Sequence, residues 1–173
     1  MDDARWEVAT SEDMHALGVR IGSTLVAGDL LVLTGPLGAG KTTLTRGIGE
    51  GLGIRGPVQS PTFVIARTHP SLVGGPPLVH VDAYRLGDAR EFDDLDLDLD
   101  RSVVVVEWGR EVAAAVADEW IDIEIARPTG ADGAVGAVVG GGDGSGGPDD
   151  QSEAPEEPRA VTVRTVRAAP TRG

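Results

Sequence analysis

The sequence contains no cysteine, which excludes disulfide bonds and metal sites built from thiolates. Aromatic residues are also rare, at 3% of the 173 residues, and no hydrophobic run approaches the length of a membrane span. The N-terminal sequence MDDARWEVAT is acidic and polar, which is unlike a secretory signal. We therefore expect a soluble cytoplasmic protein that has no contact with a membrane.

Positive charge is scarce as well, because 15 Lys and Arg residues stand against 28 Asp and Glu residues, giving a net charge of −13. Long direct contacts with nucleic acid phosphates are therefore disfavoured, and a basic protein partner suits the chain better. The length and the 40% hydrophobic content are sufficient for one domain with a buried core.

The most informative stretch is 30–43, with the sequence LLVLTGPLGAGKTT. An apolar run, typical of a strand, leads into the spacing G-x-x-x-x-G-K-T, which is that of the phosphate-binding P-loop, and then into a helix. Gly38 and Gly40 let backbone N–H groups face an anion, and the helix N-terminus points its positive dipole end at the same place. Lys41 is predicted to reach the β- and γ-phosphates, and the Thr42 hydroxyl to bind Mg²⁺. The predicted nucleotide-binding residues of this stretch are Leu37, Gly38, Ala39, Gly40, Lys41, Thr42 and Thr43.

Lys41 is the only lysine in the chain. A chance glycine-rich turn would rarely place the single lysine at the required position, even in a chain with 25 glycines. GTPases of the Ras type read guanine with an N-K-x-D segment, which would need another lysine. ATP is therefore the expected nucleotide.

Apolar patterns predict the other elements of an α/β fold. A strand at 5–9 precedes a helix that begins at Thr10 and Ser11 and closes at 28–29. The segment 102–106 does not alternate, which is typical of a strand buried on both faces of a parallel sheet, whereas 120–125 alternates like an edge or half-buried strand. Residues 94–99 fit either a strand or a helical turn. We further expect helices at 41–52 and 111–117, and strands at 63–66, 78–82 and 160–167.

The composition divides the chain into three parts. Residues 1–128 form the predicted P-loop ATPase domain. Residues 129–159 are rich in Gly, Asp, Glu and Pro, carry almost no bulky apolar side chains, and are predicted to be a disordered acidic insertion. Residues 160–173 are predicted to supply a C-terminal strand that completes the sheet, followed by a short tail, so that 120–125 and 160–167 form a hairpin with a lengthened loop.

Two predicted strands end in acids, Asp82 and Glu107. A P-loop ATPase needs Mg²⁺ ligands and a group that orients the attacking water. Strand ends beside the P-loop strand project toward the phosphates, so either acid could be the Walker-B carboxylate, and the pattern leaves the choice open.

Several other side chains have both a functional and a structural interpretation. Thr62 could sense the γ-phosphate as a switch hydroxyl or could be an ordinary turn residue. Trp108 and Tyr84 could pack near the nucleotide or in the core, and His80 is more typical of a core histidine. The acidic run 93–100 is interpreted as a solvated face or a partner surface rather than a metal site.

Four motifs together resemble the TsaE family, small bacterial P-loop ATPases required for threonylcarbamoyladenosine (t6A) modification of tRNA. They are Gly35–Gly47 (GPLGAGKTTLTRG), Ser60–Phe63 (SPTF), His80–Leu86 (HVDAYRL) and Val106–Trp108 (VEW). Their order and spacing make the resemblance specific, and it covers roughly residues 5–127. The insertion at 129–159 is a departure, since the usual compact member lacks it.

The resemblance implies a P-loop NTPase fold whose mixed sheet has a parallel centre, flanking antiparallel strands and helices on both faces. It implies that Thr42 and Glu107 hold Mg²⁺, that Asp82 is important for hydrolysis alongside Lys41, and that Thr62 lies in a switch segment. It also implies that Ser11, at the start of the first helix, lies close to the nucleotide. Trp108 is included among the predicted nucleotide-binding residues as a rare aromatic side chain beside Glu107.

The family further implies TsaB and TsaD as protein partners, with TsaD making the tRNA modification, so that tRNA is contacted only through the complex. Two alternatives remain on the residues alone. One is a small-molecule kinase with Asp82 as base and Arg85 or Arg90 closing on phosphates. The other is a non-enzymatic assembly switch that needs only ATP binding.

Overall fold

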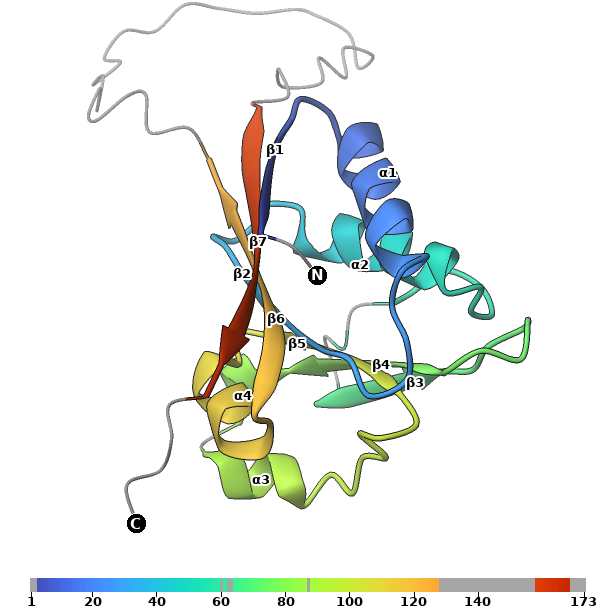
Figure 1. Cartoon of the computed structure of the whole chain (residues 1–173), viewed down its shortest axis with the longest axis vertical. Helices are drawn as coiled ribbons and strands as arrows, with labels where there is room; N and C mark the ends of the chain where they lie inside the picture. The colour runs from blue at the N-terminus through green and yellow to red at the C-terminus, as the bar shows by residue number, and fades with distance from the viewer. Residues whose placement is uncertain (1–2, 60, 62–63, 87, 128–157, 169–173) are drawn as a thin grey trace, which may run out of the picture.

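The described residues, 3–59, 61, 64–86, 88–127 and 158–168, form a mixed sheet of seven strands in the computed structural model (Figure 1). From edge to edge the strands are β1 (Ala4–Val8), β7 (Arg159–Arg167), β6 (Glu119–Ala126), β2 (Leu30–Thr34), β5 (Val103–Glu107), β4 (Leu78–Asp82) and β3 (Ala66–His69). The neighbours β6, β2, β5 and β4 run parallel, whereas the pairs β1–β7, β7–β6 and β3–β4 are antiparallel. The predicted sheet, with a parallel centre and antiparallel flanks, is confirmed.

Helices cover both faces of this sheet (Figure 1). In β2, Leu31 and Leu33 belong to the core beneath the first two helices, whereas Val32 belongs to the core beneath the last two. All four valines of β5 are buried, which confirms the expected burial on both faces of the segment 102–106. The helices are α1 (Ser11–Gly22) and α2 (Lys41–Gly51) on one face, and α3 (Ala89–Asp93) and α4 (Arg110–Val116) on the other, with a short 3-10 turn η1 (Ala83–Arg85) after β4.

The helices α1 and α2 cross in direct backbone contact. A Cβ atom added to any of four glycines would lie 2.2–2.3 Å from a backbone oxygen of the opposite helix: Gly18, Gly22, Gly47 and Gly51. Only residues without a side chain allow two helices to approach so closely. The crossing therefore fixes α1 against the helix that begins at the P-loop.

The helix α1 begins where the sequence predicts and ends earlier. The Thr10 hydroxyl accepts from the Asp13 N–H, and the Asp13 carboxylate accepts from the Thr10 N–H, which makes a capping box. At the other end, the hydroxyls of Ser23 and Thr24 donate to backbone carbonyls of the last turn at 2.8 Å. These side-chain bonds close the helix at Gly22 rather than at 28–29, because they compete with continued helical pairing.

Three other sequence predictions need correction or completion. Of the strand expected at 63–66, only Ala66 lies in a strand among the described residues, because Val64 and Ile65 form a bend before β3. The strand at 120–125 is not an edge, because it pairs with β7, and this pairing confirms the hairpin predicted between 120–125 and 160–167. Residues 94–99 form neither strand nor helix; their leucines pack against the core beneath α3 and α4.

The strand β7 begins beside the end of β6, with Ala126 opposite Ala160. Most of the predicted insertion, and Thr62 and Phe63, lie outside the described residues. The disorder of 129–159 therefore stays a prediction. Among the helices that the structure describes, none is long and apolar enough to cross a membrane.

Candidate nucleotide-binding site

The P-loop connects β2 to α2, and its glycines adopt the conformations that the motif requires. Gly38 and Gly40 have φ angles of +73° and +106°, which side chains other than glycine rarely adopt. Gly40 is the N-cap of α2 and provides no side-chain cap, so the first N–H groups of the helix face the loop without a side-chain acceptor. Such a helix start, with its dipole, favours an anion such as a phosphate.

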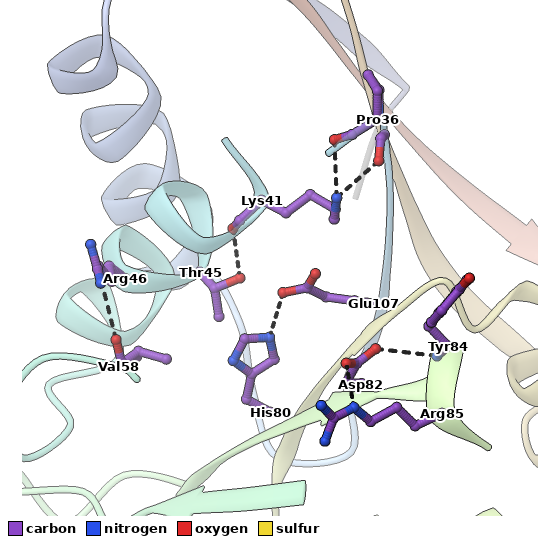
Figure 2. Close-up of polar contacts among 11 residues, drawn as sticks. Pro36, Lys41, Thr45, Arg46, Val58, His80, Asp82, Tyr84, Arg85 and Glu107 are labelled. Carbon is purple, nitrogen blue, oxygen red and sulfur yellow. Dashed lines mark hydrogen bonds and ion pairs between the residues drawn. The ribbon is translucent and has the colours of Figure 1, made fainter. Parts of the chain in front are cut away.

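Lys41 lies within the loop and is only 7% exposed. Its ammonium donates to the carbonyls of Gly35 at 2.9 Å and Pro36 at 3.2 Å (Figure 2). The ammonium also lies 4.6 Å from the centroid of the Trp108 ring. In the described part of the chain the ammonium forms no ion pair, so carbonyls and an aromatic face hold this charge. A phosphate carries a full negative charge, so it can replace these carbonyls and this ring as the partner of the ammonium.

The two predicted carboxylates meet at the same edge of the sheet. Asp82 and Glu107 are partners in the β4–β5 register, and β5 lies beside β2, which leads into the P-loop. The Asp82 carboxylate accepts from the Tyr84 N–H at 3.2 Å and lies 3.8 Å from the Arg85 guanidinium (Figure 2). Asp82 therefore also caps the 3-10 turn η1, and this bond fixes the start of the segment after β4 beside the site.

Glu107 has a different partner, the fully buried His80 on β4. One Glu107 oxygen lies 2.9 Å from His80 Nε2, so a hydrogen bond to the buried imidazole orients this carboxylate (Figure 2). The interpretation of His80 as a core histidine describes its burial but misses this contact. Burial, with the nearby His80 and Arg67, lowers the pKa of His69 on the neighbouring β3, which keeps His69 neutral near pH 7.

A cavity of about 690 Å³ joins these groups, a volume in the range of small-molecule sites. Tyr84 is 80% exposed at its mouth and Trp108 is 44% exposed, so neither is a core residue. Trp108 has φ +64°, unusual for a bulky residue, and this backbone conformation accompanies its ring position beside Lys41. The lining residues are Leu37, Gly38, Gly40, Lys41, Thr42, Thr43, Asp82, Tyr84, Arg85, Glu107 and Trp108.

Two of the predicted site residues that the structure describes are not among those lining this cavity. Ala39 is buried within the loop. Ser11 starts α1, and Met14 one turn later packs against the loop, since a Cβ on Gly40 would lie 3.3 Å from the Met14 side chain. Ser11 is thus on a helix that adjoins the P-loop, outside the cavity itself. Thr62 lies outside the described residues.

The donor set fits Mg²⁺. The Thr42 hydroxyl and the Glu107 carboxylate are oxygen ligands on the same cavity, and hard oxygen ligands are those that Mg²⁺ prefers. The described residues contain no group of three or more His, Asp or Glu that could hold a metal by itself. A Mg²⁺ ion here would take its remaining ligands from phosphate oxygens and water, as is usual for this ion.

Comparison with known protein families shows which family the chain belongs to. Residues 8–133 match the family model described as threonylcarbamoyl adenosine biosynthesis protein TsaE. The chain belongs to the TsaE family. This membership confirms the resemblance inferred from the four sequence motifs.

Relatives in the TsaE family support the assignment. A protein from Streptomyces coelicolor, called tRNA threonylcarbamoyladenosine biosynthesis protein TsaE, is 60% identical over 120 residues, which are 68% of this chain and 81% of the relative. A protein of the same name from Bacillus subtilis is 38% identical over 130 residues, which are 73% of this chain and 80% of the relative. The crystal structure of Bacillus subtilis YdiB is similar in fold, with a TM-score of 0.62 and 26% identity over 96% of this chain and 87% of that one.

Within this TsaE fold, sequence reasoning missed two features of the site. The first is the α1–α2 crossing, whose signal is a pair of glycines four residues apart in each helix: Gly18 and Gly22, then Gly47 and Gly51. The second is the bond between His80 and Glu107, which has no local signal because the two residues lie 27 positions apart.

Proposed function

We propose that this chain hydrolyses Mg·ATP and thereby serves t6A modification of tRNA, acting on a TsaB–TsaD complex. Membership of the TsaE family supports the pathway. The observation that carries the hydrolytic activity is that one cavity joins Lys41 and Thr42 of the P-loop to the strand-end carboxylates Asp82 and Glu107. These are the parts that P-loop ATP hydrolysis requires.

The P-loop side of the cavity binds and orients the triphosphate. Lys41 exchanges its carbonyl partners for the β- and γ-phosphates, and the N–H groups at the start of α2 donate to phosphate oxygens. Thr42 and Glu107 would hold Mg²⁺, and His80 orients the Glu107 carboxylate toward it. When bound, Mg²⁺ neutralises charge that develops on the phosphate oxygens.

Asp82 orients the water that attacks the γ-phosphate. One of its oxygens accepts from the Tyr84 N–H and the other lies 3.8 Å from Arg85, and these two contacts orient the carboxylate where it lines the cavity. An oriented acceptor places the water for in-line attack, which is the main contribution that a protein makes to this reaction. Water attacks phosphorus, the bond to the β,γ-bridging oxygen breaks, and ADP and phosphate leave.

The kinase alternative has less support. Of the two arginines that were considered for closing on phosphates, only Arg85 lines the cavity, and it is paired with Asp82. Arg90 lies on α3, beyond the turn that follows β4.

The test is phosphate release from Mg·ATP by the full chain, with and without TsaB and TsaD from the same organism. We expect slow release by the chain alone, faster release with the partners, and no release by Lys41→Ala. Release that requires an added hydroxyl compound, which becomes phosphorylated, would favour the kinase. Tight Mg·ATP binding with no release under any condition would favour the non-enzymatic switch.

A further inference from the structure

We propose that Arg127 contacts the nucleoside half of the bound nucleotide, beyond the phosphate site described above. This inference rests on the proposed nucleotide site. Arg127 is the first residue after β6, which runs parallel to β2 on the side opposite β5. Because parallel strands end at the same edge of a sheet, Arg127 lies at the edge where β2 leads into the P-loop.

The end of β6 packs directly on the loop. A Cβ on Gly35 would lie 2.6 Å from the Ile125 carbonyl oxygen, so the backbones touch where the loop begins. A Cβ on Gly38 would lie 3.3 Å from Nη2 of Arg127, so the guanidinium reaches the turn of the loop. Gly38 itself lines the nucleotide cavity, which places Arg127 at its rim.

Arg127 has no hydrogen-bond or ion-pair partner among the described residues, although acids outnumber basic residues in the chain by 28 to 15. Arg110 provides the contrast, because it forms a bidentate pair with Asp122 at 2.7 and 2.9 Å, which raises its pKa. A guanidinium carries five N–H donors and a planar face, and at Arg127 these are available to a ligand.

The arrangement of the acids indicates which half of the nucleotide Arg127 meets. Asp82 and Glu107 lie on β4 and β5, to one side of β2, and they define the γ-phosphate and Mg²⁺ end. Arg127 follows β6 on the other side. A nucleotide whose terminal phosphate lies toward the acids must leave the loop in the opposite direction, so its ribose and base pass the Arg127 side.

The face of the sheet agrees with this direction. Ile121, Ile123 and Ile125 pack in the core beneath α1 and α2, and the approach of the Arg127 guanidinium to Gly38 places it near the start of α2, which covers this face. The first turns of α1 adjoin the loop there through Met14. A purine between Arg127 and the start of α1 would receive the guanidinium on its π face, an interaction that changes affinity by about 3- to 30-fold.

The experiment compares Mg²⁺-dependent binding of ATP and of inorganic tripolyphosphate by calorimetry, using the full chain. Arg127→Ala should weaken ATP binding by about 3- to 30-fold and leave tripolyphosphate binding unchanged. Arg127→Lys should restore little, since it keeps the charge but not the plane. Arg101→Ala is the matched control, because it also removes an exposed arginine, and its ion-pair partner, Asp98, is 3.9 Å away and outside the cavity.

Each outcome has a distinct meaning. Equal losses for ATP and tripolyphosphate in Arg127→Ala would assign the residue to the phosphates and overturn the nucleoside contact. Unchanged binding of both ligands would overturn it as well, while leaving the nucleotide site intact. A wild-type chain that binds neither ligand would instead overturn the proposed function itself.

Discussion

Asp82 and Glu107 end neighbouring strands in register, yet their surroundings differ. Glu107 is held by a buried imidazole at 2.9 Å and keeps its other oxygen for the cavity. Asp82 is held by a backbone N–H and an exposed arginine at the start of η1. A carboxylate that a buried imidazole orients suits a metal ligand. We expect Asp82 instead to orient the attacking water.

Substitution should separate these two roles. Glu107→Gln keeps the size of the side chain but loses the charge, so it should weaken Mg²⁺-dependent ATP binding by roughly tenfold or more. Asp82→Asn should leave that binding nearly unchanged and slow hydrolysis by roughly a hundredfold. Mg²⁺ titrations of nucleotide affinity, combined with single-turnover hydrolysis, measure both effects. Normal Mg·ATP binding in Glu107→Gln together with lost binding in Asp82→Asn would show that the roles are exchanged.

Lys41 is expected to tolerate no replacement. Lys41→Ala removes the single cation that lies inside the loop, and Lys41→Arg places a planar fork where two carbonyls and the Trp108 ring surround a compact ammonium. Both variants should lose ATP binding while keeping the wild-type melting temperature within a few degrees. Fluorescence titration of a labelled nucleotide checks this, and full ATPase activity in Lys41→Arg would refute the assignment.

At the scale of elements, the four-glycine crossing holds α1 against the P-loop helix. Gly22→Ala would place a methyl group 2.2 Å from the Ile48 carbonyl oxygen, so the helices would have to separate. We expect a loss of unfolding free energy of about 2 kcal/mol or more, as for an overpacked core, with weaker ATP binding in the remaining folded protein. Gly75→Ala is the control, because its added Cβ would have no neighbour nearer than 3.6 Å. Equal denaturation midpoints for the two variants would contradict this account of the crossing.

Local signals explain which elements could be predicted from the sequence. The P-loop, the capping box at Thr10 and the buried strands β2 and β5 each depend on residues within a few positions of one another. The P-loop motif also predicted which of its residues line the cavity, apart from Ala39, which lies within the loop. These features are the ones that propensity and spacing report.

The remaining features depend on residues that are distant in sequence. The β6–β7 hairpin is an exception, because the alternating patterns of its two strands predicted the pairing despite the long connection between them. The bond between His80 and Glu107 and the approach of Arg127 to Gly38 arise only when the sheet has assembled. The end of α1 also differs from the sequence pattern, in which apolar residues at helical spacing continue to Leu25. The hydroxyls of Ser23 and Thr24 bond carbonyls of the last turn and end the helix earlier.

At the scale of the whole molecule, the connection between β6 and β7 contains the predicted acidic insertion. Deleting residues 132–157 should leave the melting temperature and Mg·ATP affinity close to wild type, because the segment has no apolar pattern to bury and long loops cost little closure entropy. Thermal unfolding and nucleotide titration of the shortened chain check this. A fall of many degrees on deletion would mean that the segment packs against the domain.

The net charge of −13 and the exposed mouth of the cavity, with Tyr84 at its edge, indicate how the molecule would use ATP. We expect it to present a different surface to its protein partners in each nucleotide state, with Thr62 as the predicted switch residue. A switch shifts binding only by its differential affinity for the two states. The affinity of the protein partners for the chain in each nucleotide state is therefore the quantity to measure.

The most direct test is therefore a titration of TsaB–TsaD onto the full chain loaded either with a non-hydrolysable ATP analogue or with ADP. The account predicts tighter partner binding to the ATP-analogue form, and a reduced difference in Thr62→Ala at nearly unchanged nucleotide affinity. Equal partner affinity for the two loaded forms of the wild-type chain would contradict it.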